Sequence, residues 1–228
     1  MGYWYVDNEI GSPGNGSSPA LAYDDIQDVL DDGAFANGDT IYIKANATRY
    51  TGARNMESYN GLDNITLDRY PTDTGTSRPV LDRESSDGFI MRFGSNNNIT
   101  VRNIHFIGTT DPAPTSNPMM AFNAGACDGM TFEYCIFECQ NHPEIFEFTS
   151  GKIDNITLKY CHFIGEDATA SHYILRTTSA AHIGSATIEH CLFEKFKTPF
   201  HMNYNDAGET ITIDHNTFIE CGGDGGGI

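Results

Sequence analysis

The residues best suited to bind a ligand are charged, amide and aromatic side chains at equivalent positions of a repeated sequence, and together they form one column. They recur about once per repeat of the sequence. The members are Arg92, Phe122, Glu147, Arg176 and Asn203, with His201 close to the last. Guanidinium, carboxylate and amide groups bond to hydroxyls, and aromatic rings pack on apolar surfaces, so the column predicts a carbohydrate-binding site. The other interpretation is a plain ion pair between Glu147 and Arg176, which at a surface contributes about 0–1 kcal/mol.

The carboxylates of the predicted strands form no compact pair or triple. The strands offer Glu147, Glu189 and Asp214, which are well separated in the sequence. Glycoside hydrolysis needs two carboxyl groups at a defined separation, one acting as acid and the other as base or nucleophile. The sequence therefore leaves the catalytic residues unknown and favours a non-catalytic protein over an enzyme.

Cysteine and histidine do not gather into a metal site. Cys135, Cys161 and Cys191 occupy one position of three successive repeats, which predicts a ladder of buried thiols. The other three cysteines lie near predicted loops and leave one disulfide open as an alternative. With no C-x-x-C pair and with eight scattered histidines, no metal site is predicted.

These residues are positioned by a phrase that returns along the chain at intervals of 25 to 34 residues. Its copies are NITLDRY (64–70), NITVRNIHFIG (98–108), GMTFEYCIFEC (129–139), NITLKYCHFIG (155–165), ATIEHCLFEKF (186–196) and TITIDHNTFIEC (210–221). Further strands are predicted between the copies, at 88–94, 118–124, 143–149, 172–178 and 199–205. A repeat that cannot bury its own apolar face must stack on its neighbours, so the sequence predicts a coil of strands.

Each copy alternates apolar and polar residues, as a half-buried strand does. In the copy at 98–108, Ile99 and Val101 form one apolar pair, and two residues intervene before Ile104 and Phe106. This change of phase predicts a sharp bend in which Asn103 takes the left-handed conformation. Stacking the copies also predicts an outward threonine column. Its members are Thr66, Thr100, Thr131, Thr157, Thr187 and Thr212.

The composition is strongly acidic, with 31 Asp and Glu against 13 Lys and Arg and a formal charge of −18. Such a surface repels nucleic acid and anionic lipid, and no apolar run is long enough to span a membrane. The amino end shows no signal peptide, so the chain either lost one or leaves its cell by another route, such as inside a virus particle. N-glycosylation sequons begin at Asn15, Asn46, Asn64, Asn98 and Asn155.

The repeats resemble the right-handed parallel β-helix of the pectate-lyase-like superfamily, which includes phage tailspikes. The opening segment, YWYVDNEIGSPGNGSSPALAYDDIQDVL followed by GDTIYIKANATRYTG, looks like the entry of these proteins, a strand, a Gly/Ser loop and a capping helix. The resemblance implies an all-β single-stranded solenoid of about seven rungs. Residues 1–45 would form the first strand, loop and cap, and 46–228 the rungs of the same continuous domain. Within the cap, Ala22, Ile26, Val29 and Leu30 make an apolar stripe.

Lyases of this superfamily use a basic residue to abstract a proton and acidic residues to hold calcium, whereas its hydrolases use grouped aspartates. The hydrolase signatures N-T-D, H-G and R-I-K are absent from this chain, and its two D-D pairs, at 24–25 and 31–32, lie in the expected cap. The resemblance is therefore specific for the fold and nearly silent about activity.

The leading functional interpretation is a non-catalytic module outside the cell or on a virion surface, of the phage spike, fibre or capsid-decoration type. Its partner would be a polysaccharide or surface glycan. The last rung, followed by GGDGGGI, has no capping element. This predicts either that the natural chain continues, or that another subunit covers the open rung in a homo-oligomer or an end-to-end contact. The alternative is a secreted polysaccharide lyase or glycoside hydrolase, with Ca²⁺ if a lyase and otherwise no cofactor. An ice-binding solenoid, suggested by the threonine column, is a remote alternative.

Overall fold

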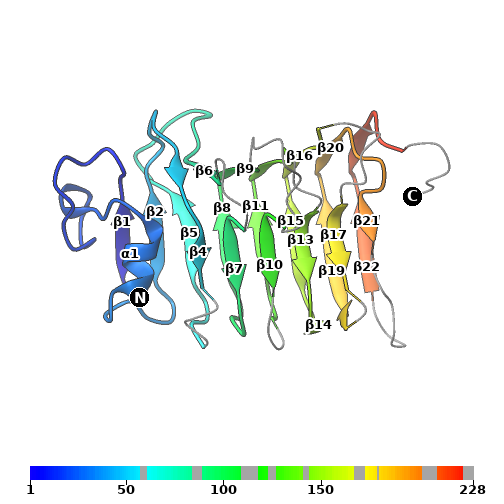
Figure 1. The fold of residues 1–228 in the computed structure, drawn as a ribbon, viewed down its shortest axis with the longest axis horizontal. Helices are drawn as coiled ribbons and strands as arrows, with labels where there is room; N and C mark the ends of the chain where they lie inside the picture. The colour runs from blue at the N-terminus through cyan, green and yellow to red at the C-terminus, as the bar shows by residue number, and fades with distance from the viewer. Residues whose placement is uncertain are drawn as a thin grey trace.

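The protein is a coil of short parallel strands, seen in a computed structural model in Figure 1. The structure describes residues 1–56, 61–83, 89–108, 118–122, 127–140, 144–166, 173–178, 180–201 and 210–222. All recorded strand pairs are parallel, and each joins strands of successive turns. The predicted parallel β-solenoid is therefore confirmed.

Three long sheets make up the walls of the coil. The first, eight-stranded sheet contains β1 (Tyr3–Val6), β2 (Thr40–Ile43), β5 (Thr66–Arg69), β8 (Thr100–Arg102), β11 (Thr131–Glu133), β15 (Ile156–Lys159), β19 (Ser185–Glu189) and β22 (Thr210–Asp214). The second, seven-stranded sheet contains β3 (Tyr50–Thr51), β6 (Val80–Asp82), β9 (His105–Ile107), β12 (Ile136–Glu138), β16 (His162–Ile164), β20 (Leu192–Glu194) and β23 (Thr217–Ile219). The third, six-stranded sheet contains β4 (Arg54–Asn55), β7 (Met91–Phe93), β10 (Met120–Phe122), β13 (Glu144–Phe148), β17 (Tyr173–Thr177) and β21 (Phe200–His201).

A fourth, two-stranded sheet pairs β14 (Gly151–Ile153) with β18 (Ala181–Ile183). Turns with strands in all three long sheets are fewer than the seven rungs predicted. At the amino end β1 has no counterparts in the second and third sheets, and among the described residues no third-sheet strand follows β23.

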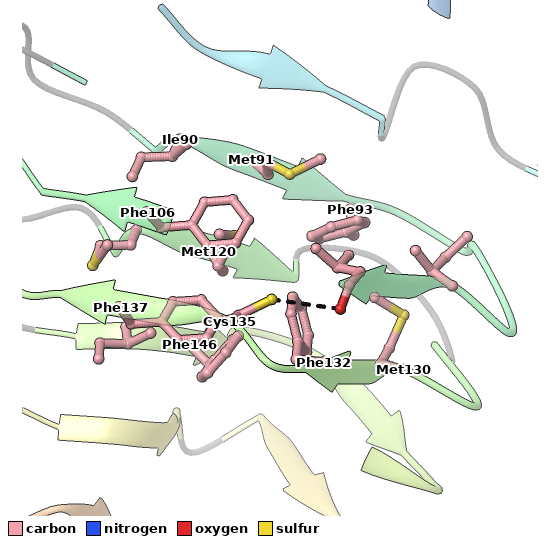
Figure 2. Close-up of a cluster of buried hydrophobic side chains, with 14 of the residues drawn as sticks. Ile90, Met91, Phe93, Phe106, Met120, Met130, Phe132, Cys135, Phe137 and Phe146 are labelled. Carbon is pink, nitrogen blue, oxygen red and sulfur yellow. Dashed lines mark hydrogen bonds between the residues drawn. The ribbon is translucent and has the colours of Figure 1, made fainter. Parts of the chain in front are cut away.

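The core is a stack of aromatic rings inside the coil. Phe106, Phe137, Phe163 and Phe193 lie at successive turns with ring centroids 5.0–5.1 Å apart. Figure 2 shows Phe106 and Phe137 in this stack, with Phe146 contributed by the third sheet. The stack follows from the parallel register, because equivalent residues of successive strands point the same way.

The cysteines are free thiols, and the predicted ladder of Cys135, Cys161 and Cys191 is buried in one column. Each sulfur donates to a carbonyl of the preceding turn, as Cys161 does to Phe132 O at 3.4 Å. Figure 2 shows the corresponding bond of Cys135 as a dashed line. The thiols therefore satisfy backbone groups near the bend rather than bridging strands.

The bend between the first and second sheets is left-handed at five successive turns, beginning with Asn103 (φ 57°), where the sequence predicted it. The equivalent Tyr134, Tyr160, His190 and His215 have φ values from 51° to 56°. Their rings stack along the outside of the coil, with Tyr134 and Tyr160 only 4.9 Å apart and nearly parallel. Ring stacking offsets part of the strain of bulky side chains in this conformation.

The threonine column of the first sheet is in register, and Thr40 extends it by one turn. The neighbouring outward column carries cross-turn ion pairs, with Arg102 Nε 3.4 Å from Asp68 Oδ2. Lys159 Nζ lies 2.6 Å from Glu189 Oε1 in the same column. The outward column beside the threonines is therefore a charged one.

A short helix, α1 (Ile26–Asp31), lies at the amino end of the coil, after the 3-10 turn η1 (Pro19–Leu21). The predicted apolar stripe of Ala22, Ile26, Val29 and Leu30 is buried. Asp25 caps the helix by accepting from Gln27 N at 2.8 Å. None of the described helices is long and apolar enough to cross a membrane.

Candidate functional site

The third sheet has an irregularity that determines which side chains face outward. At the start of β17, the N–H groups of Ile174 and Leu175 both donate to Pro199 O, at 2.7 and 3.4 Å. Two consecutive residues therefore occupy one inward position, as in a β-bulge. The same doubled, buried pair recurs in four turns, as Ile90 and Met91, Met119 and Met120, Ile145 and Phe146, and Ile174 and Leu175.

The bulge shifts the alternation, so that residues three apart can face the same side. Glu144 before the doubled pair and Glu147 after it both reach Arg176 on the outer face of the next turn. The residues that follow the bulge in successive strands are paired in register and form one outward column. Its members are Arg92, Ala121, Glu147, Arg176 and His201.

The structure therefore aligns four of the predicted site residues, namely Arg92, Glu147, Arg176 and His201. The prediction for Phe122 was wrong by one residue, because the pair at Met119 and Met120 moves Ala121 into the outward column. Phe122 is instead inside the coil, 2% exposed, with its ring 5.0 Å from Phe93. Asn203 lies outside the described residues.

Arg176 is held between two carboxylates of the preceding turn. Its Nη1 pairs with Glu144 Oε1 and lies 3.6 Å from Glu147 Oε1. The Arg176 side chain is 38% exposed, whereas that of Glu144 is 1% exposed. Glu144 Oε2 is buried and has no hydrogen-bond partner among the residues that the structure describes. The buried Glu144 carboxylate thus holds the Arg176 guanidinium in place, while Glu147 and Arg176 remain partly exposed.

Burial controls the acidity of this cluster. It raises the pKa of Glu144, and the attraction of Arg176 offsets only part of that effect. The pKa of Glu147 is also raised by burial, again against the opposing influence of Arg176. Burial by itself would lower the pKa of Arg176, but Glu144 and Glu147 raise it overall. The two carboxyl groups consequently hold protons more readily than exposed glutamates do.

Aromatic groups lie beside the charged ones. The Arg176 guanidinium is 5.9 Å from the ring centroid of Tyr173, which is itself 5.3 Å from the ring of His201. At the other end of the same face, Arg92 lies 5.4 Å over the ring of Phe89. The arrangement offers hydrogen-bonding groups next to ring surfaces over several turns.

Sequence reasoning missed Glu144, Tyr173 and Phe89. All three precede a doubled apolar pair, where simple alternation assigns them to the wrong face. The signal was available, since adjacent apolar residues open each of these strands, as in Ile145–Phe146. Such a pair at the same place in four successive turns is better explained by a recurring bulge position than by a strand with two apolar faces.

Within the described part of the chain, no group of three or more His, Cys, Asp or Glu side chains is placed to hold a metal ion. Arg176 already neutralises much of the charge of the two glutamates, which makes this cluster a poor cation site.

Several predicted glycosylation sequons use their amides within the fold. Asn46 Nδ2 donates to Asp7 Oδ1 at 2.6 Å, and Asn155 Nδ2 donates to Asp128 Oδ1 at 2.7 Å. Asn98 Nδ2 donates to Asn64 Oδ1 at 3.2 Å, so one hydrogen bond uses the side-chain amides of two sequons. The side-chain oxygen of Asn15 accepts from Ser17. A glycan attached to Asn46, Asn98 or Asn155 would compete with these contacts.

Comparison with known proteins yields little sequence similarity. No known protein-family profile matches the chain, and no curated protein sequence matches it. Among solved structures, the chain is similar to a rhamnogalacturonan lyase, with a TM-score of 0.49 and 12% sequence identity. The matched region covers 95% of this chain and 62% of that protein.

Proposed function

We propose that the protein binds a polysaccharide on the outer face of the third sheet, centred on Glu147, Tyr173 and Arg176. The observation that carries this proposal is the fixed position of Arg176, which pairs with buried Glu144 and with Glu147. A guanidinium fixed in this way loses little further rotational freedom when it bonds a sugar hydroxyl. The neighbouring Tyr173 ring supplies an apolar surface for the sugar ring.

The shape of the coil supports an extended ligand rather than a compact one. Equivalent positions repeat at each turn, about 4.8 Å apart, so that successive sugars can meet successive rungs. The proposal also includes a right-handed coil and a location outside the cell or on a virion surface, both suggested by the resemblance to pectate-lyase-like β-helices. A homo-oligomer with end-to-end contacts would extend the same face.

The test is binding of immobilised polysaccharides by the wild type and by Arg176→Met. A matched control is Arg102→Met, because Arg102 is 41% exposed and also pairs with a carboxylate, but on the first sheet. We expect Arg176→Met to weaken binding about tenfold or more, the value of one charged hydrogen bond, and Arg102→Met to leave it unchanged. Equal effects of the two changes, or no binding to any polysaccharide, would exclude this site.

Cleavage of the bound glycan is a second candidate, favoured by the raised pKa of both Glu144 and Glu147. A carboxyl group that stays protonated can donate to a leaving glycosidic oxygen, while an ionised neighbour acts as base or nucleophile. Incubation with the bound polysaccharide would release reducing ends if the protein is a hydrolase, and unsaturated ends if it is a lyase. Loss of product with Glu147→Gln, at unchanged glycan affinity, would assign the chemistry to this carboxyl group.

A further inference from the structure

A groove in the surface shares no residue with the third-sheet cluster. It has a volume of about 420 Å³ and lies at the ends of β12 and β16 in the second sheet. The lining residues that matter here are Glu138, Gln140, Ile164, Gly165, Glu166 and Lys195. A groove of this size holds one or two sugar-sized groups, and its lining combines charged, amide and apolar surfaces.

The floor of the groove depends on a close approach of two backbone segments. A Cβ atom on Gly165 would lie 2.3 Å from Lys195 O, so only glycine fits at this position. Gly165 N donates to Glu194 O at 2.8 Å, which fixes the two turns together. Lys195 has a φ of 62°, in the left-handed region, and its side chain is exposed at the rim. The apolar part of the floor is Ile164, in register between Glu138 and Glu194.

Glu138 is held rigidly at one side of this floor. Gln140 Nε2 donates to Glu138 Oε1, and His105 Nε2 of the preceding turn lies 3.3 Å from Glu138 Oε2. Since a carboxylate can accept about four hydrogen bonds, Glu138 keeps acceptor capacity for a ligand. Two turns further along, His162 Nε2 lies 2.8 Å from Glu194 Oε2 in the same relationship. Histidine-supported carboxylates therefore flank Ile164 on both sides.

The charge of the groove selects the class of ligand. Glu138 and Glu166 carry two negative charges against one positive charge on Lys195, and the whole chain is formally −18. Anionic ligands are therefore disfavoured and a protonated amine is favoured. Hydroxyl groups would bond to Gln140 and the carboxylates, and the apolar face of a sugar ring would lie on Ile164. We propose that this groove binds an amino sugar through its ammonium group.

The test compares a chitosan tetramer, which carries free amines, with the fully N-acetylated tetramer, which has the same rings but no charge. Titration calorimetry at about 0.15 M salt suppresses diffuse attraction, because the Debye length is then about 8 Å. We expect the chitosan tetramer to bind and the acetylated tetramer to bind at least about tenfold more weakly, the contribution of one charged hydrogen bond. Equal binding of the two tetramers, or binding of neither, would overturn the proposal.

Variants locate the binding. Glu138→Gln and, separately, Glu166→Gln should each weaken chitosan binding about tenfold, while Glu133→Gln, with the same charge change on the first sheet, should have no effect. An equal loss with Glu133→Gln would mean that the net charge of the chain attracts the ligand, and the groove assignment would be wrong. Because the groove shares no residue with the third-sheet cluster, a loss of chitosan binding in Glu138→Gln is independent of the outcome at Arg176. Circular dichroism of each variant verifies that the fold is intact.

Discussion

Arg54 Nη2 lies 2.7 Å from Asp25 Oδ2, and this ion pair joins the amino-terminal cap to the first turns of the coil. The Arg54 side chain is 0% exposed and also donates to Thr51 O at 3.2 Å. Asp25 is at the same time the N-cap of α1. A single carboxylate thus both initiates the helix and compensates the buried charge beneath it.

Asp25→Ala is expected to destabilise the protein by about 3 kcal/mol, because it leaves the Arg54 guanidinium buried without its counter-charge and removes the helix cap. Urea unfolding followed by circular dichroism measures this change. The double variant Asp25→Ala/Arg54→Met should recover part of the loss, since it removes the unpaired charge as well. If the double variant is less stable than Asp25→Ala alone, the pairing does not control the cap.

The buried thiols give a second prediction, about reactivity. Burial raises the pKa of Cys161 well above that of an exposed thiol, and burial raises the pKa of Cys127 to about 11. Because the thiolate is the reactive form, both should resist alkylation in the native protein. Cys221, which is partly exposed, should be labelled first by a maleimide. Peptide mass spectrometry after timed labelling gives the order, and early labelling of Cys161 would contradict the buried ladder.

Sequence alone predicted the first and second sheets well, because their residues come from the recurring phrase. Its strict alternation fixed Val101 and Phe106 as inward and Thr100 as outward, and the two-residue change of phase located the left-handed bend at Asn103. Once one turn is known in a parallel coil, register assigns the others, so the threonine column and the ladder of buried thiols followed directly.

The third sheet could be predicted only in part. Its strands have no shared phrase, and the doubled position at Met119 and Met120 shifts the alternation by one, which put Phe122 on the wrong face. The role of Glu144 was hidden for the same reason, since a glutamate at the start of a strand usually faces solvent. The groove at Gly165 depends on a contact with Lys195 in the next turn, which no local pattern reveals.

The left-handed bend, where aromatic rings of successive turns stack, gives a third prediction. It separates the contribution of backbone strain to stability from that of ring packing. Tyr160 has a φ of 53° and stacks on Tyr134 at 4.9 Å and on His190 at 5.1 Å. In Tyr160→Asn, the loss of about 1–2 kcal/mol of stacking is offset by about 1 kcal/mol of relieved strain, because asparagine tolerates this conformation. Tyr160→Val loses the same stacking and adds the strain of a β-branched residue.

Chemical denaturation should therefore rank wild type and Tyr160→Asn within about 1 kcal/mol of each other, with Tyr160→Val lower by about 2 kcal/mol or more. Asn103 occupies the same bend position naturally and makes the asparagine variant a conservative control. Equal stabilities of the asparagine and valine variants would show that left-handed strain has no weight at this position.

The final prediction concerns pH and the acidic helix α1. Burial raises the pKa of Asp28 from 3.8 to about 6, with a further contribution from Asp24. Between about pH 4 and pH 6 the folded chain therefore binds more protons at this position than the unfolded chain. The stability that the protonated Asp28 contributes is present below the unfolded pKa and is lost as pH rises through the folded pKa.

Asp28→Asn removes this dependence on pH. The stability of the variant relative to wild type should therefore rise by about 1 kcal/mol between pH 4 and pH 7, after allowance for solvent screening. Urea unfolding of both proteins at pH 4, 7 and 8 measures the difference, which should not change between pH 7 and 8. A variant that loses stability relative to wild type on going from pH 4 to pH 7 would reverse the sign and show that the Asp28 carboxylate is stabilised, not opposed, by its surroundings.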